Sequence, residues 1–270
     1  MLDCKRKFQL TVLKGLQRPT NKYAALGSAF HTAVELFDKG MPMKEAIEIG
    51  LTKNPLANRK QLEVICVMFS LSKQKPCLVI NNAPCLEIKF KYFYTSVLIE
   101  GEKTNVYLCG TIDKIYMDGD TLVIRDYKTS SAVKDIQGNL SKYQMAFQLP
   151  FYTYALLHSD ILPEEYKERI RQGAFRTEIH GVFYNTEPPQ FKTCISPQFS
   201  ADFLTKEVPK IILDKINEVL DILAMKSTPH DGICHNSCVY CDYRPACLSM
   251  GTYIEEEFLS RFETKPYNPL

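Results

Sequence analysis

The most constraining feature of the sequence is a predicted strand pair that carries charge among apolar side chains. Residues 110–131 read GTIDKIYMDGDTLVIRDYKTSS, in which Val, Ile, Leu and Tyr surround Asp113, Asp126 and Lys128. A charged group buried in an apolar strand pair lowers stability unless something pairs with it. These three residues therefore either lie on a solvated face, joined by a cross-strand salt bridge, or hold a bound group.

The turn of this hairpin falls in the segment MDGDT, which offers two-residue loops of the Asp-Gly and Gly-Asp type. A loop at Gly119-Asp120 places Asp113 directly opposite Asp126, and moving the loop back by one residue makes them diagonal neighbours. Because side chains alternate along a strand, either register puts both carboxylates and Lys128 on one face, with β-carbons about 5 to 8 Å apart. A three-residue loop would send the two aspartates to opposite faces.

Two carboxylates at this separation favour a bound cation. They repel each other, and one takes up a proton unless a positive charge lies between them. Hard oxygen ligands suit Mg²⁺ or Mn²⁺. The Lys128 amine reaches the same place, where it can steady an attacking water or the charge that develops on a phosphate. The pattern predicts a hydrolytic metal site, with the solvated salt bridge as its alternative.

Composition restricts the class of protein. The chain has 270 residues, 45% hydrophobic and 24% charged, with a net charge of +2, which is ordinary for a soluble globular protein. Any nucleic-acid surface must therefore be a local patch. No apolar run approaches the roughly 20 residues of a membrane span. The opening MLDCKRKFQL lacks a signal-peptide core, so we expect an intracellular, cytoplasmic protein without a membrane partner.

The periodicity of the sequence predicts an α+β fold, a central mixed β-sheet flanked by helices in one compact unit over 1–270. The expected helices span 3–17, 23–37, 43–51, 58–73, 141–159 and 202–225, the last interrupted or started by Pro209, and the expected strands span 85–99, 105–117, 121–128, 179–185 and 190–195. Pro150 is expected to kink or restart its helix.

Four short motifs occur in one order along the chain. They are LGSAFH ending at His31, GTID ending at Asp113, DYKT from Asp126, and a helical Gln148 and Tyr152 one turn apart. In this order and content the chain resembles the RecB-type branch of the PD-(D/E)XK nucleases. The resemblance implies a restriction-endonuclease-like fold, with 1–80 as a mainly helical part, 83–228 as the nuclease core and 229–250 as a cysteine segment.

The resemblance also implies roles for individual residues. His31, Asp113 and Asp126 would be metal ligands together with the Tyr127 carbonyl, and Lys128 would be the catalytic lysine. Gln148 and Tyr152 would contact DNA or support the site. Glu87, on the strand that precedes the hairpin, would tune the metal or the lysine.

The cysteines at the two ends of the chain form a second pattern. Cys238, Cys241 and Cys247 follow a C-x2-C-x5-C spacing, and Cys4 lies far upstream. This set is similar to the [4Fe–4S] ligands of the AddB nuclease domain and the CRISPR-associated adaptation exonucleases, with Lys5 replacing the usual proline after the first cysteine. The alternative is a local zinc site of four thiolates in which Cys234 replaces Cys4.

The resemblance implies a metal-dependent DNA nuclease, an exonuclease on DNA ends or single strands, in recombination, repair or viral DNA processing. A helicase or recombination protein is a candidate partner. The alternative is a non-cleaving DNA-binding or scaffold protein of the same fold with a structural zinc site. The basic residues expected to contact phosphates are Lys5, Arg6, Lys7, Lys14 and Arg18.

Overall fold

The chain divides into two compact units, which we describe separately. One unit covers Thr20–Val208, and the other joins Met1–Pro19 to Pro209–Leu270. The computed structural model describes residues 4–17, 21–72, 74–131, 147–196, 199–224, 241–248, 256–257, 259–260 and 262–264. The assignment of the whole chain to a single domain stays a prediction.

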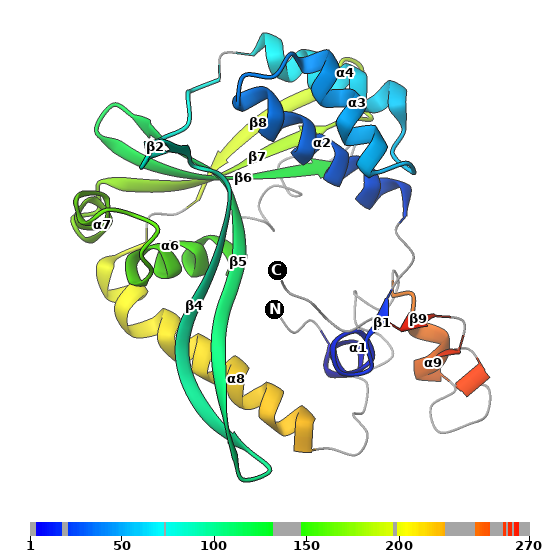
Figure 1. Cartoon of the computed structure of the whole chain (residues 1–270), viewed down its shortest axis with the longest axis vertical. Coiled ribbons are helices and arrows are strands. Elements are labelled where there is room, and N and C mark those ends of the chain that lie inside the picture. The colour runs from blue at the N-terminus through cyan, green and yellow to red at the C-terminus, as the bar shows by residue number, and fades with distance from the viewer. Residues whose placement is uncertain are drawn as a thin grey trace. The chain divides into compact units, whose positions relative to one another are not determined.

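The larger unit is built on a five-stranded mixed sheet, as the sequence predicts (Figure 1). The strands lie in the order β4-β5-β6-β7-β8, and only β6 and β7 run parallel among these neighbours. β7 begins earlier than expected. The strand bounds are β4 (Leu86–Ile99), β5 (Glu102–Asp118), β6 (Thr121–Ser130), β7 (Phe175–Phe183) and β8 (Gln190–Ile195), and a small hairpin precedes them, β2 (Val79–Ile80) and β3 (Ala83–Pro84).

Helices cover both faces of the sheet. Helices α2 (Lys22–Asp38), α3 (Met43–Lys53) and α4 (Arg59–Leu71) form an apolar core with β6, β7 and β8 on one face. The side chains of Asn21 and Asn58 cap α2 and α4 by accepting backbone N–H bonds, which explains where these two helices begin. On the other face, Leu149 of α6 (Gln148–His158) packs on β7 and β8.

The parallel β6–β7 pair requires a crossover, and the described part of this connection contains α6 and α7 (Glu164–Arg171). Helix α7 lies outside the helices that the sequence pattern predicts. The predicted helix over 141–159 is observed from Gln148 to His158, and residues 141–146 lie outside the described ranges. Two π-helical turns also occur, η1 (Gln9–Leu13) and η2 (Phe203–Glu207).

The β5–β6 hairpin has the register that a Gly119-Asp120 loop requires. Asp118 pairs with Thr121, and Lys114 pairs with Arg125. Gly119 has a φ of +60°, which a two-residue hairpin turn with glycine in its first position needs. The next pair outward along this register would be Asp113 with Asp126.

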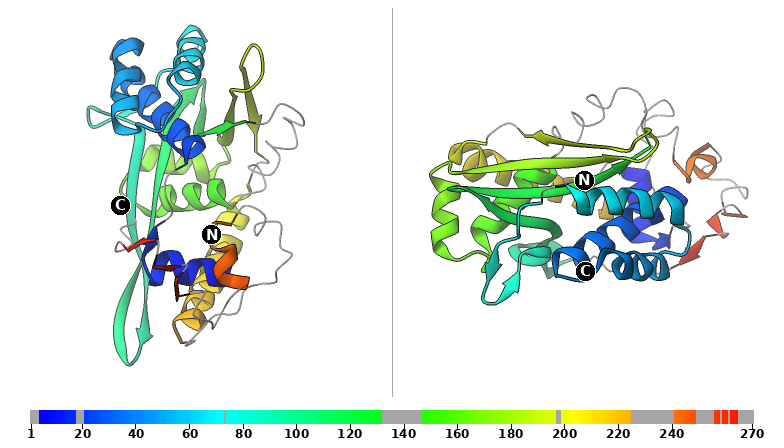
Figure 2. Two further views of the ribbon diagram at one scale, coloured as in Figure 1. Left: turned by 90° about the vertical axis from the view of Figure 1, so that its right-hand side faces the viewer. Right: turned by 90° about the horizontal axis from the view of Figure 1, so that it is seen from above.

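β5 leaves β6 at this point. Its pairing with β6 ends at Lys114, whereas its pairing with β4 continues to Glu102. Residues Ile88–Ile99 and Glu102–Ile112 therefore form a two-stranded extension, which we call the arm (Figures 1 and 2). The two predicted carboxylates lie where the arm separates from the sheet.

A buried ion pair joins α2 to the base of the arm. Lys114 is fully buried (0% exposed), and its Nζ lies 2.5 Å from Asp38 Oδ2 at the end of α2. One strand over, Arg125 donates to Glu178 Oε1 at 2.5 Å, and the Tyr116 hydroxyl donates to the same oxygen at 2.7 Å. Each buried charge is paired with an opposite charge, and without its partner it would destabilise the fold.

The smaller unit brings the two ends of the chain together. It contains α1 (Lys5–Phe8), β1 (Leu16–Gln17), α8 (Val208–Ala224) from Pro209 onward, α9 (Arg244–Leu248) and β9 (Glu263–Thr264). β1 pairs with β9, and the buried Tyr243 hydroxyl donates to the Leu16 carbonyl at 2.5 Å. The predicted helix over 3–17 is shorter than expected because the chain turns into β1.

No helix among the described residues has the length and apolar character that crossing a bilayer demands.

Replacing Lys114 by alanine should leave the Asp38 carboxylate buried without its partner. This should lower the free energy of unfolding by about 3–5 kcal/mol. The double variant Lys114→Met/Asp38→Leu, which removes both charges, should recover most of this loss. Chemical denaturation of the three proteins measures both effects. A loss below about 1 kcal/mol in Lys114→Ala would contradict the ion pair as described.

Candidate metal centre

The two predicted carboxylates are buried rather than solvated. Asp113 is 8% exposed and Asp126 is 2% exposed, so the alternative of a solvated salt-bridged face is wrong. Asp113 Oδ2 accepts a hydrogen bond of 2.6 Å from the Tyr127 backbone N–H. The side chain thus replaces the strand-to-strand bond that is lost where β5 leaves β6, because a buried N–H needs a partner.

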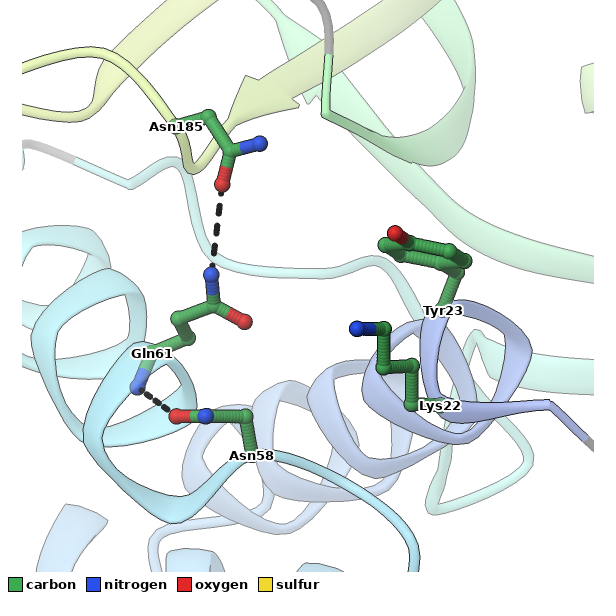
Figure 3. Close-up of a pocket in the computed structure, with 5 residues that line it drawn as sticks. All are labelled: Lys22, Tyr23, Asn58, Gln61 and Asn185. Carbon is green, nitrogen blue, oxygen red and sulfur yellow. Dashed lines mark hydrogen bonds between the residues drawn. The ribbon is translucent and has the colours of Figure 1, made fainter.

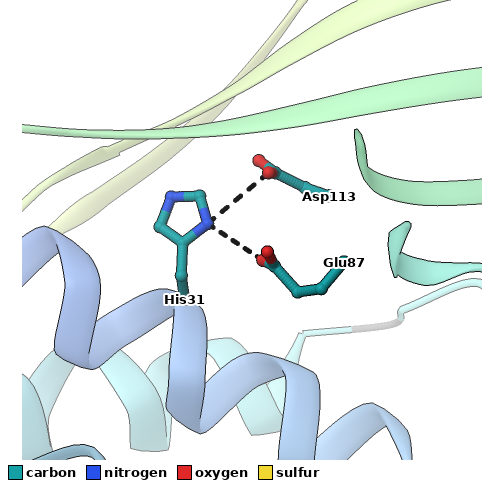
Figure 4. A group of neighbouring side chains, drawn as sticks. All are labelled: His31, Glu87 and Asp113. Atoms are coloured by element: carbon teal, nitrogen blue, oxygen red, sulfur yellow. Dashed lines mark hydrogen bonds and ion pairs between the residues drawn. The ribbon is translucent and has the colours of Figure 1, made fainter. Parts of the chain in front are cut away.

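Three side chains from separate elements converge on one point (Figure 4). His31 on α2, Glu87 on β4 and Asp113 on β5 present ligand atoms that all lie within 4.8 Å of one another. His31 Nδ1 is 3.3 Å from Glu87 Oε1 and 3.6 Å from Asp113 Oδ1. Among the residues that the structure describes, this is the one group of three or more potential ligands.

Glu87 has an unusual backbone conformation for a strand residue. Its φ is +46°, in the left-handed region that residues with a Cβ rarely adopt. The flanking residues Leu86 and Ile88 pair with Lys114 and Ile112, so Glu87 lies opposite Asp113. Such local strain persists where the surrounding structure enforces it, and it is frequent in functional sites. The family resemblance implies a tuning role for Glu87, and in the structure its carboxylate lies beside His31 and Asp113.

Crowded negative charge perturbs the titration of the site. The pKa of Asp113 is raised to about 7, chiefly by burial and also by the charges of Asp126 and Glu87, against the opposing effect of His31 and the Tyr127 N–H. Burial also raises the pKa of Asp126 despite Lys128. Burial lowers the pKa of His31, but its hydrogen bond to Glu87 and the nearby carboxylates outweigh this, and the net shift is upward.

Asp126 lies beside this group rather than within it, held by two donors. Lys128 Nζ lies 2.9 Å from Oδ1 and 2.7 Å from Oδ2, and Gln148 Nε2 donates to Oδ1 at 2.9 Å. Gln148 Nε2 also lies 2.7 Å from the Tyr152 hydroxyl. The structure thus links the DYKT motif of β6 to the Gln148 and Tyr152 pair of α6.

Two motif glycines make room for this packing. A Cβ on Gly27 would lie 3.0 Å from Thr129 Oγ1, so α2 approaches the DYKT strand closely. A Cβ on Gly110 would lie 2.6 Å from the Phe90 ring and 3.1 Å from the Tyr152 ring. Both glycines were noted only as parts of motifs, because their role depends on contacts between segments far apart in sequence.

The donor set fits a hard divalent cation. Three carboxylates and one imidazole face a buried region in which, among the described residues, only Lys128 and a protonated His31 offer positive charge. Asp126 Oδ2 is buried, and no donor from the described part of the chain is aligned for a hydrogen bond to it despite the nearby amine. Oxygen-rich sites of this kind are typical of Mg²⁺ and Mn²⁺.

The Tyr127 side chain lies in the apolar core, unlike the side chains of Asp126 and Lys128, which lie at the candidate site. Its ring is buried and forms edge-to-face contacts with Phe30 and Phe69 in the core. The predicted ligand is its backbone carbonyl, and that role stays a prediction.

The terminal cysteines are described in part. Cys4 and Cys247 are both near enough to the buried Arg6 to affect its pKa, which burial lowers and the two thiols raise. Cys241 packs beside the apolar cluster of Leu10 and Tyr243. Cys234 and Cys238 lie outside the described residues, so the predicted ligand set stays a prediction.

The predicted phosphate contacts differ in exposure. Lys14 is exposed, and Lys5 and Lys7 are partly exposed. Arg6 is 3% exposed and its guanidinium donates to Gln9, so this side chain does not face solvent as the prediction required. Arg18 lies outside the described residues.

A hollow of about 220 Å³ lies apart from these ligands, at the beginnings of α2 and α4 (Figure 3). It is lined by Lys22, Tyr23, Asn58, Gln61 and Asn185, and Gln61 donates to Asn185 Oδ1 at 3.2 Å. It has one cation and no carboxylate, and this composition does not suit a divalent metal ion.

Comparisons with known proteins match the chain to one nuclease family. The family model of the PD-(D/E)XK nuclease superfamily matches residues 1–248. No curated protein matches the chain. Among solved structures, one described as a "Putative exonuclease" from Eubacterium rectale is 14% identical with a TM-score of 0.45, covering 87% of this chain and 80% of its own. The structure of SSO0001 is 12% identical with a TM-score of 0.33, covering 88% and 92%. The chain belongs to the PD-(D/E)XK nuclease superfamily.

Proposed function

We propose that the protein is a metal-dependent deoxyribonuclease that hydrolyses phosphodiester bonds at the site formed by His31, Glu87, Asp113, Asp126 and Lys128. The observation that carries this proposal is the convergence of the first three side chains within 4.8 Å, beside a buried carboxylate and an amine. Structural ion pairs neutralise each other, but this group has surplus negative charge. A surplus of this kind supports a site for a bound cation.

The expected metal is Mg²⁺ or Mn²⁺. His31, Glu87 and Asp113 would hold it, with Asp126 and the Tyr127 carbonyl as further ligands by the family resemblance. When bound, such an ion stabilises charge on the phosphate and lowers the pKa of a water.

Lys128 is the residue proposed to act on the reacting groups. Its side chain is 25% exposed, so the amine can meet a substrate while it remains next to Asp126. There it would stabilise the negative charge that develops on the phosphate and orient the attacking water. Gln148 is a positioning residue, because it holds Asp126 through one oxygen and reaches the Tyr152 hydroxyl.

The substrate class follows from the family. We infer that the protein acts as an exonuclease on DNA ends or single strands, in recombination, repair or viral DNA processing, with a helicase or recombination protein as a candidate partner. The exposed Lys14 is a candidate phosphate contact. A non-cleaving DNA-binding or scaffold protein is the second candidate, and loss of the lysine would be expected in such a protein, whereas this chain retains it.

For the smaller unit we infer a [4Fe–4S] cluster held by Cys4, Cys238, Cys241 and Cys247. The pairing of β1 with β9 and the effect of both Cys4 and Cys247 on Arg6 support it, since they bring the two ends of the chain together. A ligand set that closes so long a loop would stabilise the fold by about 5 kcal/mol in the chain-entropy model. The alternative remains a zinc site with Cys234.

The metal site predicts opposite effects of Asp113→Asn with and without metal. In EDTA the variant should be more stable than wild type, because it removes one of several crowded buried charges. Saturating Mn²⁺, at about 100 times its Kd, should stabilise wild type by about 2.7 kcal/mol and the variant far less. Thermal unfolding followed by circular dichroism measures both, with Asp120→Asn in the exposed turn as control. An equal Mn²⁺ response in wild type and Asp113→Asn would overturn the site.

The nuclease proposal predicts that Lys128→Ala lowers the cleavage rate of labelled single-stranded DNA by about 10²–10³-fold. Binding of the same DNA in EDTA should change only a few-fold. Lys44→Ala, which removes an exposed lysine of α3, is the matched control and should cleave like wild type. Equal cleavage by wild type and Lys128→Ala would contradict the proposed role, and metal-dependent cleavage absent from both would favour the scaffold alternative.

The cluster proposal predicts that protein purified without oxygen is brown and contains iron. Cys4→Ser should lose both the visible absorbance and the iron, whereas Cys77→Ser, in the other unit, should retain them. Elemental analysis distinguishes the alternatives. Zinc that survives in Cys4→Ser and is lost in Cys234→Ser would replace the cluster with the local thiolate site.

A further inference from the structure

The arm is the part of the sheet that the proposed chemistry does not use. Beyond Asp113 its strands pair only with each other among the described residues, since β5 has already separated from β6 (Figure 1). An isolated two-stranded ribbon is marginally stable unless something covers a face. The two faces of the arm differ in what covers them.

Helix α6 covers one face. Phe90 contacts Phe151 and Tyr152 at ring distances of 5.8 and 5.9 Å. Further out, Tyr92 meets His158 at 6.2 Å, and Tyr94 meets Tyr154 at 6.3 Å. This aromatic layer anchors the arm on the helix that also supplies Gln148 to the metal centre.

The opposite face carries two aromatic rings and two amines that remain exposed. Side chains alternate along a strand, and cross-strand partners share a face. The partners on this face are Lys89 with Thr111, Lys91 with Cys109, and Phe93 with Tyr107. Phe93 is 49% exposed and Tyr107 is 43% exposed, and both lysines are exposed.

These four side chains form one local arrangement. The Phe93 and Tyr107 rings lie 5.9 Å apart, edge to face, and Lys91 Nζ lies 5.1 Å from the centre of the Tyr107 ring. Among the described residues, neither Lys89 nor Lys91 forms an ion pair with a carboxylate. A register shift between Phe93 and Thr95 ends the pattern. The rings and amines thus form one patch, and at the outer end of the arm the apolar Leu98 lies apart from it.

The patch is continuous with the metal centre along β5. Asp113, Thr111, Cys109 and Tyr107 alternate with the residues that face α6, and β5 has no register break between them. At about 3.3 Å per residue, Tyr107 lies at most about 20 Å along the strand from Asp113. A chain that leaves the metal centre along the arm meets the two amines first and the two rings last.

We propose that this face of the arm binds single-stranded DNA. The inference rests on the proposed nuclease function, whose substrate it specifies. Bases stack on Phe93 and Tyr107, while Lys89 and Lys91 contact the phosphates that precede them. Exposed aromatic rings interleaved with cations are how proteins bind single strands without reading their sequence. Duplex DNA is a poorer occupant, because its base faces are already stacked and only its phosphates could engage the lysines.

The test measures binding in EDTA, where metal-dependent cleavage does not occur. Full-length protein is titrated into fluorescently labelled oligothymidine and into a duplex of equal length. Phe93→Ala/Tyr107→Ala should weaken single-strand binding by about 10-fold or more, and duplex binding little. Tyr107→Phe retains the ring and should bind like wild type. Leu98→Ala removes another exposed apolar side chain of the arm and is the matched control.

The contribution of Lys89 and Lys91 is measured separately, by the salt dependence of binding. Lys89→Ala/Lys91→Ala should lower the slope of log affinity against log salt by about 1.4, since each phosphate contact of a single strand contributes about 0.7. Thermal unfolding of every variant checks that the arm remains folded. Hydrolysis of the small ester thymidine 5′-(p-nitrophenyl phosphate), which is too short to reach the arm, should be the same in wild type and the arm variants.

The outcomes separate this inference from the nuclease proposal. Weaker single-strand binding in the ring variant supports the arm even if no metal-dependent hydrolysis is found. Hydrolysis with unchanged single-strand binding in the ring variant overturns the arm and leaves the nuclease standing. Equal losses for duplex and single strand, or a loss of self-association in place of DNA binding, also overturn it.

Discussion

The structure depends on the point at which β5 leaves β6. There the Asp113 carboxylate accepts the Tyr127 N–H, a bond that a continuing strand would have made with its backbone. Because a side-chain oxygen takes the place of a backbone carbonyl, the Tyr127 N–H remains hydrogen-bonded although the two strands separate. Around this point, His31 of α2 approaches Asp113, and Gln148 of α6 donates to Asp126. The buried charge at this point is what a cation would neutralise.

Much of this arrangement was predictable from local patterns. Of the two-residue loops that the sequence offers, the structure has Gly119-Asp120, and the register of β5 and β6 follows from it as far as Lys114 and Arg125. The helices predicted over 23–37, 43–51 and 58–73 correspond to α2, α3 and α4. The spacing of Gln148 and Tyr152 by one helical turn puts both on one side of α6, where the structure finds them.

Other features depend on contacts that a single segment does not encode. Glu87 adopts a left-handed backbone opposite Asp113, although it is not one of the residue types, such as glycine or asparagine, that favour this conformation. Arg6 lies in a basic stretch typical of a solvated helix, but its side chain is buried and donates to Gln9. The short α7 is almost entirely polar and has little apolar pattern to detect. The need for glycine at position 110 comes from the Phe90 ring, which leaves no room for a Cβ there.

The same strand pair also explains why the centre and the arm belong together. β4 supplies Glu87 and β5 supplies Asp113 at the base, and the same two strands carry Phe93 and Tyr107 further out. Helix α6 stabilises both ends, through Gln148 at the centre and through its aromatic contacts with the arm. A change in the packing of α6 would therefore alter ligand positions and arm orientation together.

The central claim is that His31, Glu87 and Asp113 surround one divalent ion. Crystals of the protein grown with Mn²⁺ and measured for anomalous scattering test it most directly. The account predicts a strong anomalous peak between these three side chains, adjacent to Asp126. Full Mn²⁺ occupancy at another place in the molecule, with these side chains still bonded only to each other, would contradict it.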